Sequence, residues 1–304
     1  QIDNVDLGAT EAWQGSAQGV YNGNPIYIVG GADNVSVSTD GNGFTSTGRT
    51  AKSGLVAVAN GNLCAVNTDG NNNAGSYSSD GGTSWSDTSL GITATDTVKD
   101  IAGSTSSSVV IGVYHGSATT TANLKSTDGG NSWGAAAPFP TADNWSCVAY
   151  GEGTWVALAG TAASPSNNGA YSTDDGSTWT AFTLPASSAW AKVTWGKDRF
   201  VATTAKTDSS TAETAVSFDG ITWYAGSMEP GEWNAIGYTQ GLFCCAKSDT
   251  GGESDVVAFS RDGFHWRNKL LSAGNEKHVG IMAIPTESKF MIAISGQQQT
   301  ARIT

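Results

Sequence analysis

One short motif recurs six times along this chain of 304 residues. Each copy begins with a serine, has an aspartate two residues later, and continues through a glycine to a tryptophan or phenylalanine. Successive aspartates lie 40 to 48 residues apart, and they are Asp40, Asp80, Asp128, Asp174, Asp219 and Asp262. A repeat of this length is typical of the four-stranded blade of a β-propeller, so the chain is expected to fold as a ring of similar β-sheets.

The residue types of the motif predict a tight β-hairpin. An aspartate at the end of a strand accepts hydrogen bonds from the backbone of the turn that follows, and glycine supplies a positive φ. The aromatic residue then begins the returning strand and buries its ring between neighbouring units. The aromatic follows the aspartate by five residues in three copies and by four in the other three, which predicts two related hairpin loops.

On these residues the chain resembles the Asp-box repeat family, also called BNR, whose pattern is Ser-x-Asp-x-Gly-x-x-Trp. Two copies depart from it: Phe44 replaces the tryptophan in the first, and Asp175 precedes the glycine in the fourth. The resemblance implies that each motif lies on the hairpin between the third and fourth strands of a blade. It also implies that the six aspartates are structural and have no catalytic or metal-binding role.

The segments between the motifs predict the other strands of each blade. Segments that begin at Trp145, Trp190 and Trp233 are each followed ten residues later by an aromatic of a second strand. After the last motif come two strand-like runs and a terminal one, while residues 4–10 resemble residues 87–93, which follow the second motif. We therefore expect an all-β, seven-bladed β-propeller in a single domain, residues 1–304, with residues 1–10 as the outer strand of the last blade.

Charge and cysteine content exclude several classes of function. The net charge of −12, from 15 basic and 27 acidic residues, argues against nucleic-acid binding, which depends on lysine and arginine. The apolar stretches are too short to cross a membrane. Cys64, Cys147, Cys244 and Cys245 lie in apolar runs without the spacing of metal ligands, so we expect buried thiols, no metal site and no cofactor.

The Asp-box family includes sialidases, so catalysis has to be considered. Resemblance to a sialidase would require three converging arginines, usually with an early Arg-Ile-Pro, yet the chain has five scattered arginines and lacks that tripeptide. Histidine and serine show no triad order or HExxH pattern. The chain is therefore expected not to be an enzyme.

An alternative keeps catalysis open. On the face formed by the loops that lead into the first strands, here named the loop face, acidic residues of the sixth, seventh and first blades form an arc: Glu229, Glu232, Glu276 and Glu11. A pair of such carboxylates is what a glycoside hydrolase or a lyase of this fold would use. The other interpretation is a solvated acidic rim.

Aromatic residues recur at the start of first strands on the same face: Trp145, Trp190 and Trp233, followed by His278 at the equivalent position. Their rings are candidates for stacking on a sugar. Because the same residue type recurs at the same phase, packing between blades is the other interpretation.

The function predicted from these observations is that of a non-catalytic structural or interaction propeller. The repeat also resembles those of phage tail and capsid appendages and of bacterial surface proteins. That likeness implies a virion or cell-surface component, which binds a glycan or protein receptor or other virion proteins and which can form a homo-oligomer. The expected reduced cysteines fit a protein that folds first in a cytoplasm. A third reading, an assembly factor resembling the photosystem II stability propellers, is less favoured because those use a basic patch.

Overall fold

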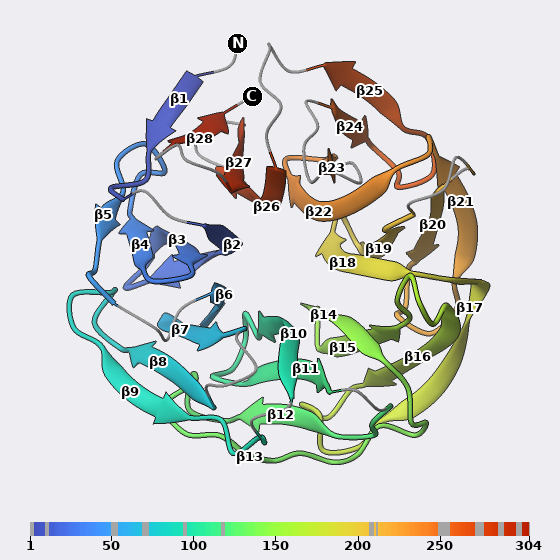
Figure 1. The fold of residues 1–304 in the computed structure, drawn as a ribbon, viewed down its shortest axis with the longest axis horizontal. Coiled ribbons are helices and arrows are strands. Elements are labelled where there is room, and N and C mark those ends of the chain that lie inside the picture. The colour runs from blue at the N-terminus through green and yellow to red at the C-terminus, as the bar shows by residue number, and fades with distance from the viewer. Residues whose placement is uncertain are drawn as a thin grey trace.

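A computed structural model describes residues 3–9, 12–49, 54–68, 73–93, 96–116, 119–206, 210, 212–248, 256–270, 277–284, 289–295 and 300–303. Their regular elements are β-strands, and these residues contain no helix long and apolar enough to cross a membrane. The strands form seven four-stranded antiparallel sheets arranged around a common centre (Figure 1). The fold is therefore all-β.

Six sheets are continuous blades, each made of four consecutive strands, and we number them one to six in chain order. The first two are β2 (Trp13–Tyr21), β3 (Asn24–Gly31), β4 (Val35–Ser38), β5 (Thr45–Ser46), and β6 (Gly54–Ala59), β7 (Asn62–Asn67), β8 (Ala74–Ser78), β9 (Ser86–Ser89). The third and fourth are β10 (Thr97–Gly103), β11 (Val110–His115), β12 (Asn123–Ser126), β13 (Gly134–Ala135), and β14 (Trp145–Gly151), β15 (Thr154–Ala159), β16 (Ser166–Ser172), β17 (Thr180–Ser188). The fifth and sixth are β18 (Trp190–Gly196), β19 (Arg199–Thr204), β20 (Ala212–Ser217), β21 (Tyr224–Met228), and β22 (Glu232–Thr239), β23 (Leu242–Ser248), β24 (Val256–Ser260), β25 (Arg267–Leu270).

The remaining sheet is a composite of both ends of the chain. Its strands are β26 (Lys277–Ile284), β27 (Lys289–Ser295), β28 (Thr300–Ile303) and the outer strand β1 (Asp3–Asp6), which pairs with β28. The expected outer strand of residues 1–10 is thus corrected to a shorter one. Gly8 has a φ of 77° and donates its N–H to Asp6 Oδ1, so the chain turns there, and Leu7 packs against Trp13 in the first blade.

The first strand of each sheet is the innermost one (Figure 1). Each first strand packs against the first strand of the next sheet, and β26 packs against β2, which closes the ring. Six of these seven strands contain a β-bulge near their start. In β2, β14 and β18 the bulge directly follows Trp13, Trp145 and Trp190. Because a bulge redirects the side chains that follow it, the bulges set what faces the centre of the ring.

The hydrophobic core lies between neighbouring sheets. One cluster, for example, joins Leu158 and Phe182 of the fourth blade to Trp190 and Phe200 of the fifth. All four cysteines are buried and unpaired, which confirms the expected buried thiols. Burial raises the pKa of the Cys64 thiol to about 12, so this thiol is protonated and unreactive at neutral pH.

The six repeated motifs form hairpins between third and fourth strands. In every copy the serine hydroxyl donates to Oδ1 of the aspartate, at 2.7–3.0 Å. The same hydroxyl oxygen accepts a glycine N–H, from Gly41, Gly82, Gly130, Gly176, Gly220 or Gly263. These glycines all have φ between 72° and 100°, which L side chains rarely adopt. The serine, aspartate and glycine of each motif are therefore joined by hydrogen bonds within a single turn.

The two spacings of the motif correspond to two hydrogen-bond patterns. Where the aromatic comes four residues after the aspartate, Oδ1 accepts the N–H groups of the second and third residues that follow it. Where it comes five after, Oδ1 accepts the N–H of the fourth residue, and Oδ2 accepts the hydroxyl of that residue: Ser84, Ser132 or Thr178. In the longer loop, the aspartate therefore accepts one backbone N–H fewer and gains a hydrogen bond from a side-chain hydroxyl.

These hydrogen bonds make the stability of the propeller depend on acid pH. The hydroxyls of Ser84 and Thr178 and the backbone N–H groups beside them hold the pKa of Asp80 and Asp174 at about 2. Since the pKa in the folded state is below that of the unfolded chain, the stabilisation is complete above about pH 4 and is lost as the pH falls to about 2. We expect the midpoint of thermal unfolding, followed by circular dichroism, to fall across this interval.

The control is the variant D80N/D174N, which lacks both titrating groups. It should start from a lower midpoint at neutral pH and should lose less between pH 4 and pH 2 than the wild type. Equal acid slopes for the two proteins would contradict the assignment of this effect to the motif carboxylates.

Candidate functional site

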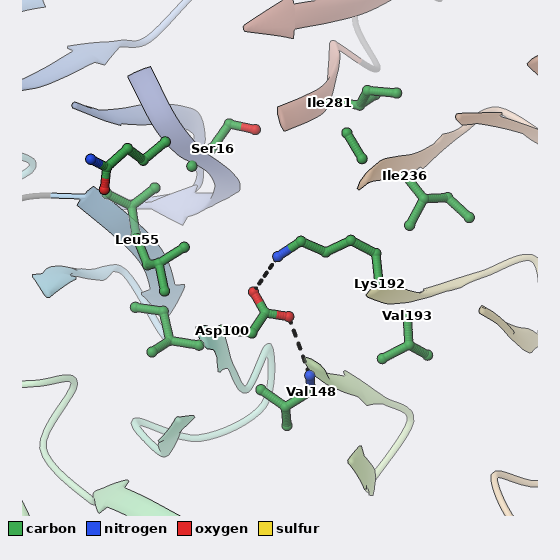
Figure 2. Close-up of a pocket in the computed structure, with 13 residues that line it drawn as sticks. Ser16, Leu55, Asp100, Val148, Lys192, Val193, Ile236 and Ile281 are labelled. Atoms are coloured by element: carbon green, nitrogen blue, oxygen red, sulfur yellow. Dashed lines mark hydrogen bonds and ion pairs between the residues drawn. The ribbon is translucent and has the colours of Figure 1, made fainter. Parts of the chain in front are cut away.

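A cavity of about 150 Å³ lies at the centre of the ring, between the first strands. Most of its lining residues have apolar side chains, and Ser16, Asp100 and Lys192 of β2, β10 and β18 add polar groups to it (Figure 2). The lining residues with polar side chains are Gln14, Ser16, Asp100 and Lys192, and those with apolar ones include Leu55, Ile101, Val148, Val193, Ile236 and Ile281. The centre of the propeller is thus a small hollow with one charged pair.

Lys192 and Asp100 form an ion pair across this cavity. Lys192 Nζ lies 2.7 Å from Asp100 Oδ1, and the lysine side chain reaches from the fifth blade toward the third (Figure 2). Both residues directly follow the bulge of their own strand, so they occupy the same level of the ring. Asp100 Oδ2 also accepts the N–H of Val148, at 3.2 Å, from the fourth blade. One carboxylate therefore links three adjacent blades.

The charge state of this pair follows from its geometry. Burial alone lowers the pKa of Lys192, but the charge and hydrogen bond of Asp100 outweigh it and raise that pKa above its ordinary value. The lysine is thus a permanent cation that is paired with its neighbour. Sequence reasoning missed both residues, although aligning the first strands on their opening aromatic would have placed them at one level of the ring.

The structure corrects the sugar-stacking interpretation of three tryptophans. Trp145, Trp190 and Trp233 are 0%, 1% and 0% exposed, so their rings are not accessible to a ligand. Their indole N–H groups donate to backbone carbonyls: Trp145 to Thr120 and Thr141, Trp190 to Ser166 and Ala186 at the ends of β16 and β17, Trp233 to Glu229. These residues tie the loops and strand ends of the loop face to the core. His278 lies in β26, and its side chain is outside the described part of the structure.

The acidic arc is only partly within the described residues, because Glu11 and Glu276 lie outside them. Glu232 is the first residue of β22 and pairs with Ser248. The exposed side chain of Glu229 is directed to its own blade, where Oε2 accepts the amide of Asn268 on β25. The carboxylate of Glu229 is therefore already hydrogen-bonded within the described structure.

Two other carboxylates of the loop face are already paired. The buried Asp143 accepts Ser166 Oγ at 2.6 Å and Asn168 Nδ2 at 2.7 Å. Glu213 accepts Lys206 Nζ at 2.8 Å and Ser188 Oγ at 2.9 Å. Within the described ranges, no group of three or more histidine, cysteine, aspartate or glutamate side chains is arranged to hold a metal ion.

The motif hairpin of the fifth blade carries exposed apolar side chains that sequence reasoning also missed. Phe218, Ile221 and Tyr224 are 50%, 41% and 51% exposed, and they are three of the five large hydrophobic side chains exposed to this degree in the described structure. The rings of Phe218 and Tyr224 meet edge to face, with centroids 6.2 Å apart. The guanidinium carbon of Arg199 lies 4.8 Å from the centroid of Phe218. We name these four residues the aromatic hairpin.

The aromatic hairpin is held rigidly between blades. Arg199 donates to the carbonyl of Asp262, and Lys197 Nζ donates to that of Arg261, both in the motif of the sixth blade. Gly220 of the hairpin lies against the fourth blade, where an added Cβ would be 2.9 Å from the Thr154 side chain. A sequence signal existed: Phe218 occupies a variable motif position that is Thr or Ser in four of the other five copies.

Comparison with family models and with curated proteins finds no match to this chain. Solved structures do resemble it. The virginiamycin B lyase of Staphylococcus aureus aligns over 100% of this chain and 98% of its own, with a TM-score of 0.75 and 11% identity. A YCF48 structure bound to a D1 peptide aligns over 99% and 96%, with a TM-score of 0.65 and 15% identity.

A further solved structure, YCF48 from Cyanidioschyzon merolae, aligns over 99% of this chain and 98% of its own, with a TM-score of 0.68 and 12% identity. These neighbours include a lyase and a protein bound to a peptide, so they do not share one activity. Identities this low show a common fold alone. The chain is a β-propeller with the fold of these proteins.

Proposed function

We propose that this protein is a non-catalytic interaction propeller that binds a protein partner through the aromatic hairpin. The observation that carries the proposal is the concentration of exposed Phe218, Ile221 and Tyr224 on one rigid turn beside Arg199. Aromatic residues and arginine are enriched in protein interfaces and supply much of their binding energy. A turn fixed by the motif hydrogen bonds loses little conformational entropy when it binds.

Two further observations support a role without catalysis. Each carboxyl group of the described residues whose pKa departs from its ordinary value departs downward, whereas a general acid needs a raised pKa. The Lys192–Asp100 pair is mutually neutralised. The peptide bound by the structural neighbour YCF48 shows that this fold can hold a protein segment. The proposed setting, a virion or a cell surface, rests on the likeness of the repeat to phage and bacterial surface proteins.

The test is selection of binders from a display library of short random peptides, followed by affinity measurement against the variant F218S/Y224S. Both side chains are half exposed, so the variant should unfold within about 0.5 kcal/mol of the wild type and should bind selected peptides at least about tenfold more weakly. The matched control is Leu270→Ser, which removes an apolar side chain that is 71% exposed on β25. Selected peptides that bind F218S/Y224S as tightly as the wild type would refute this surface.

A further inference from the structure

A second surface, on the first three blades, has a different chemistry from the aromatic hairpin. It is a groove of about 590 Å³ on the face that carries the turns between first and second strands. Its size lies within the range of about 300–1,000 Å³ that is usual for ligand sites. The residues that line it come from the end of β2, the turns that follow β2, β6 and β10, and the second motif, and they include Gln18, Tyr21, Asn22 and Asn60.

None of the residues that line this groove is charged, although the chain as a whole carries −12. Its polar groups are amides and hydroxyls. Gln18, Asn22 and Asn60 are exposed, and their side-chain amides form no hydrogen bond with any other described residue. Each amide offers both a donor and an acceptor, which matches adjacent hydroxyl groups of a ligand better than it matches an ion.

Tyr21 gives the groove an aromatic side. The same residue, together with Asn22, lines a second hollow of about 430 Å³ formed with Asn24, Pro25 and Thr39. Its ring rests on backbone: a Cβ added to Gly81 would lie 2.9 Å from Tyr21 Cε1. The ring is thus packed against a glycine with a φ of 71°, and Tyr21 lines both hollows.

From this lining we propose that the groove is a binding site for a neutral saccharide of more than one sugar unit. An uncharged groove with free amides and a fixed aromatic ring provides hydrogen bonds for sugar hydroxyls and an apolar surface for a pyranose ring. The two hollows share Tyr21 and Asn22, and together they provide room for more than one unit. The site is separate from the aromatic hairpin and from the tryptophans of the loop face.

The turns of the groove allow a variant that removes amides without strain. Asn22 and Asn60 have φ of 50° and 47°, a region that glycine adopts freely. N22G/N60G therefore deletes two amides and keeps the backbone of both turns. Glu152→Gly is the matched control, because Glu152 has a φ of 45° at the equivalent turn of the fourth blade, outside the groove. Gln18→Ala is a second variant that leaves the turns unaltered.

The experiment is a glycan array with the purified protein, followed by calorimetric titration of any neutral oligosaccharide that binds, with sialylated and sulfated glycans and a neutral peptide as other probes. We expect a neutral oligosaccharide to bind the wild type and Glu152→Gly equally, and N22G/N60G and Gln18→Ala about tenfold more weakly. Three results would overturn the proposal: no neutral saccharide binds, only charged glycans or the peptide bind, or all four proteins bind equally.

Discussion

The variant Lys192→Met is expected to lower the free energy of unfolding by about 3 kcal/mol, because it leaves a carboxylate buried at the centre of the ring without its counter-ion. Asp100 is 9% exposed and pairs with the lysine at 2.7 Å. Methionine keeps the length and the apolar stem of lysine, so packing changes little and the loss reports on charge. The measurement is urea unfolding at neutral pH, followed by tryptophan fluorescence.

The double variant D100L/K192M tests the physical reason. When both charges are absent, no ion is left unpaired, and we expect a free energy of unfolding within about 1 kcal/mol of the wild type. Asp100→Leu alone leaves the Lys192 ammonium without its counter-ion, so its free energy of unfolding should also be lower than that of the double variant. If instead the two single losses add up in the double variant, the residues are not coupled, and the ion pair does not connect the third and fifth blades energetically.

The variant Trp190→Ala is expected to cost about 3–5 kcal/mol of the free energy of unfolding, the usual effect of removing a fully buried aromatic. Trp190 is 1% exposed and packs among residues of the fourth and fifth blades, including Leu158 and Phe200. Its removal also leaves the carbonyls of Ser166 and Ala186 without the indole N–H. Urea unfolding measures the loss.

The control is Tyr224→Ala, which removes a half-exposed aromatic from the same blade and should cost no more than about 0.5 kcal/mol. This pair of variants separates the two interpretations of the recurring tryptophans. A Trp190→Ala protein that keeps wild-type stability but loses binding to a ligand would restore the sugar-stacking interpretation of the loop face and would contradict the buried position of the ring.

The repeated motif could be predicted because its interactions are local. Ser78, Asp80 and Ser84 bond one another within a single turn, so spacing alone distinguishes the two hairpin types. The resemblance of residues 4–10 to residues 87–93 pointed to an outer strand, and β1 lies there, beside β28. The length of β1 was not predictable, since it depends on how Leu7 enters the core of the first blade.

The recurring tryptophans could not be assigned from their spacing. A ring for packing and a ring for ligand stacking give the same period, and only the packing of neighbouring sheets shows that Trp145 and Trp190 are buried. The aromatic hairpin and the groove around Tyr21 could not be predicted from the sequence for a similar reason. Phe218 and Arg199 are 19 positions apart in the sequence, and Tyr21 and Gly81 are 60 apart. Only the packing of the sheets brings each pair into contact.

By itself, then, the sequence determined the all-β repeat, its motif hairpins and the absence of a basic or membrane-spanning composition, because these follow from local hydrogen bonds and from summed charge. The tertiary structure alone decided which side chains are free to bind. Exposure depends on how neighbouring sheets pack, and that packing buries Trp145, Trp190 and Trp233, pairs Lys192 with Asp100, and leaves Phe218, Tyr224 and the amides around Tyr21 open to a partner.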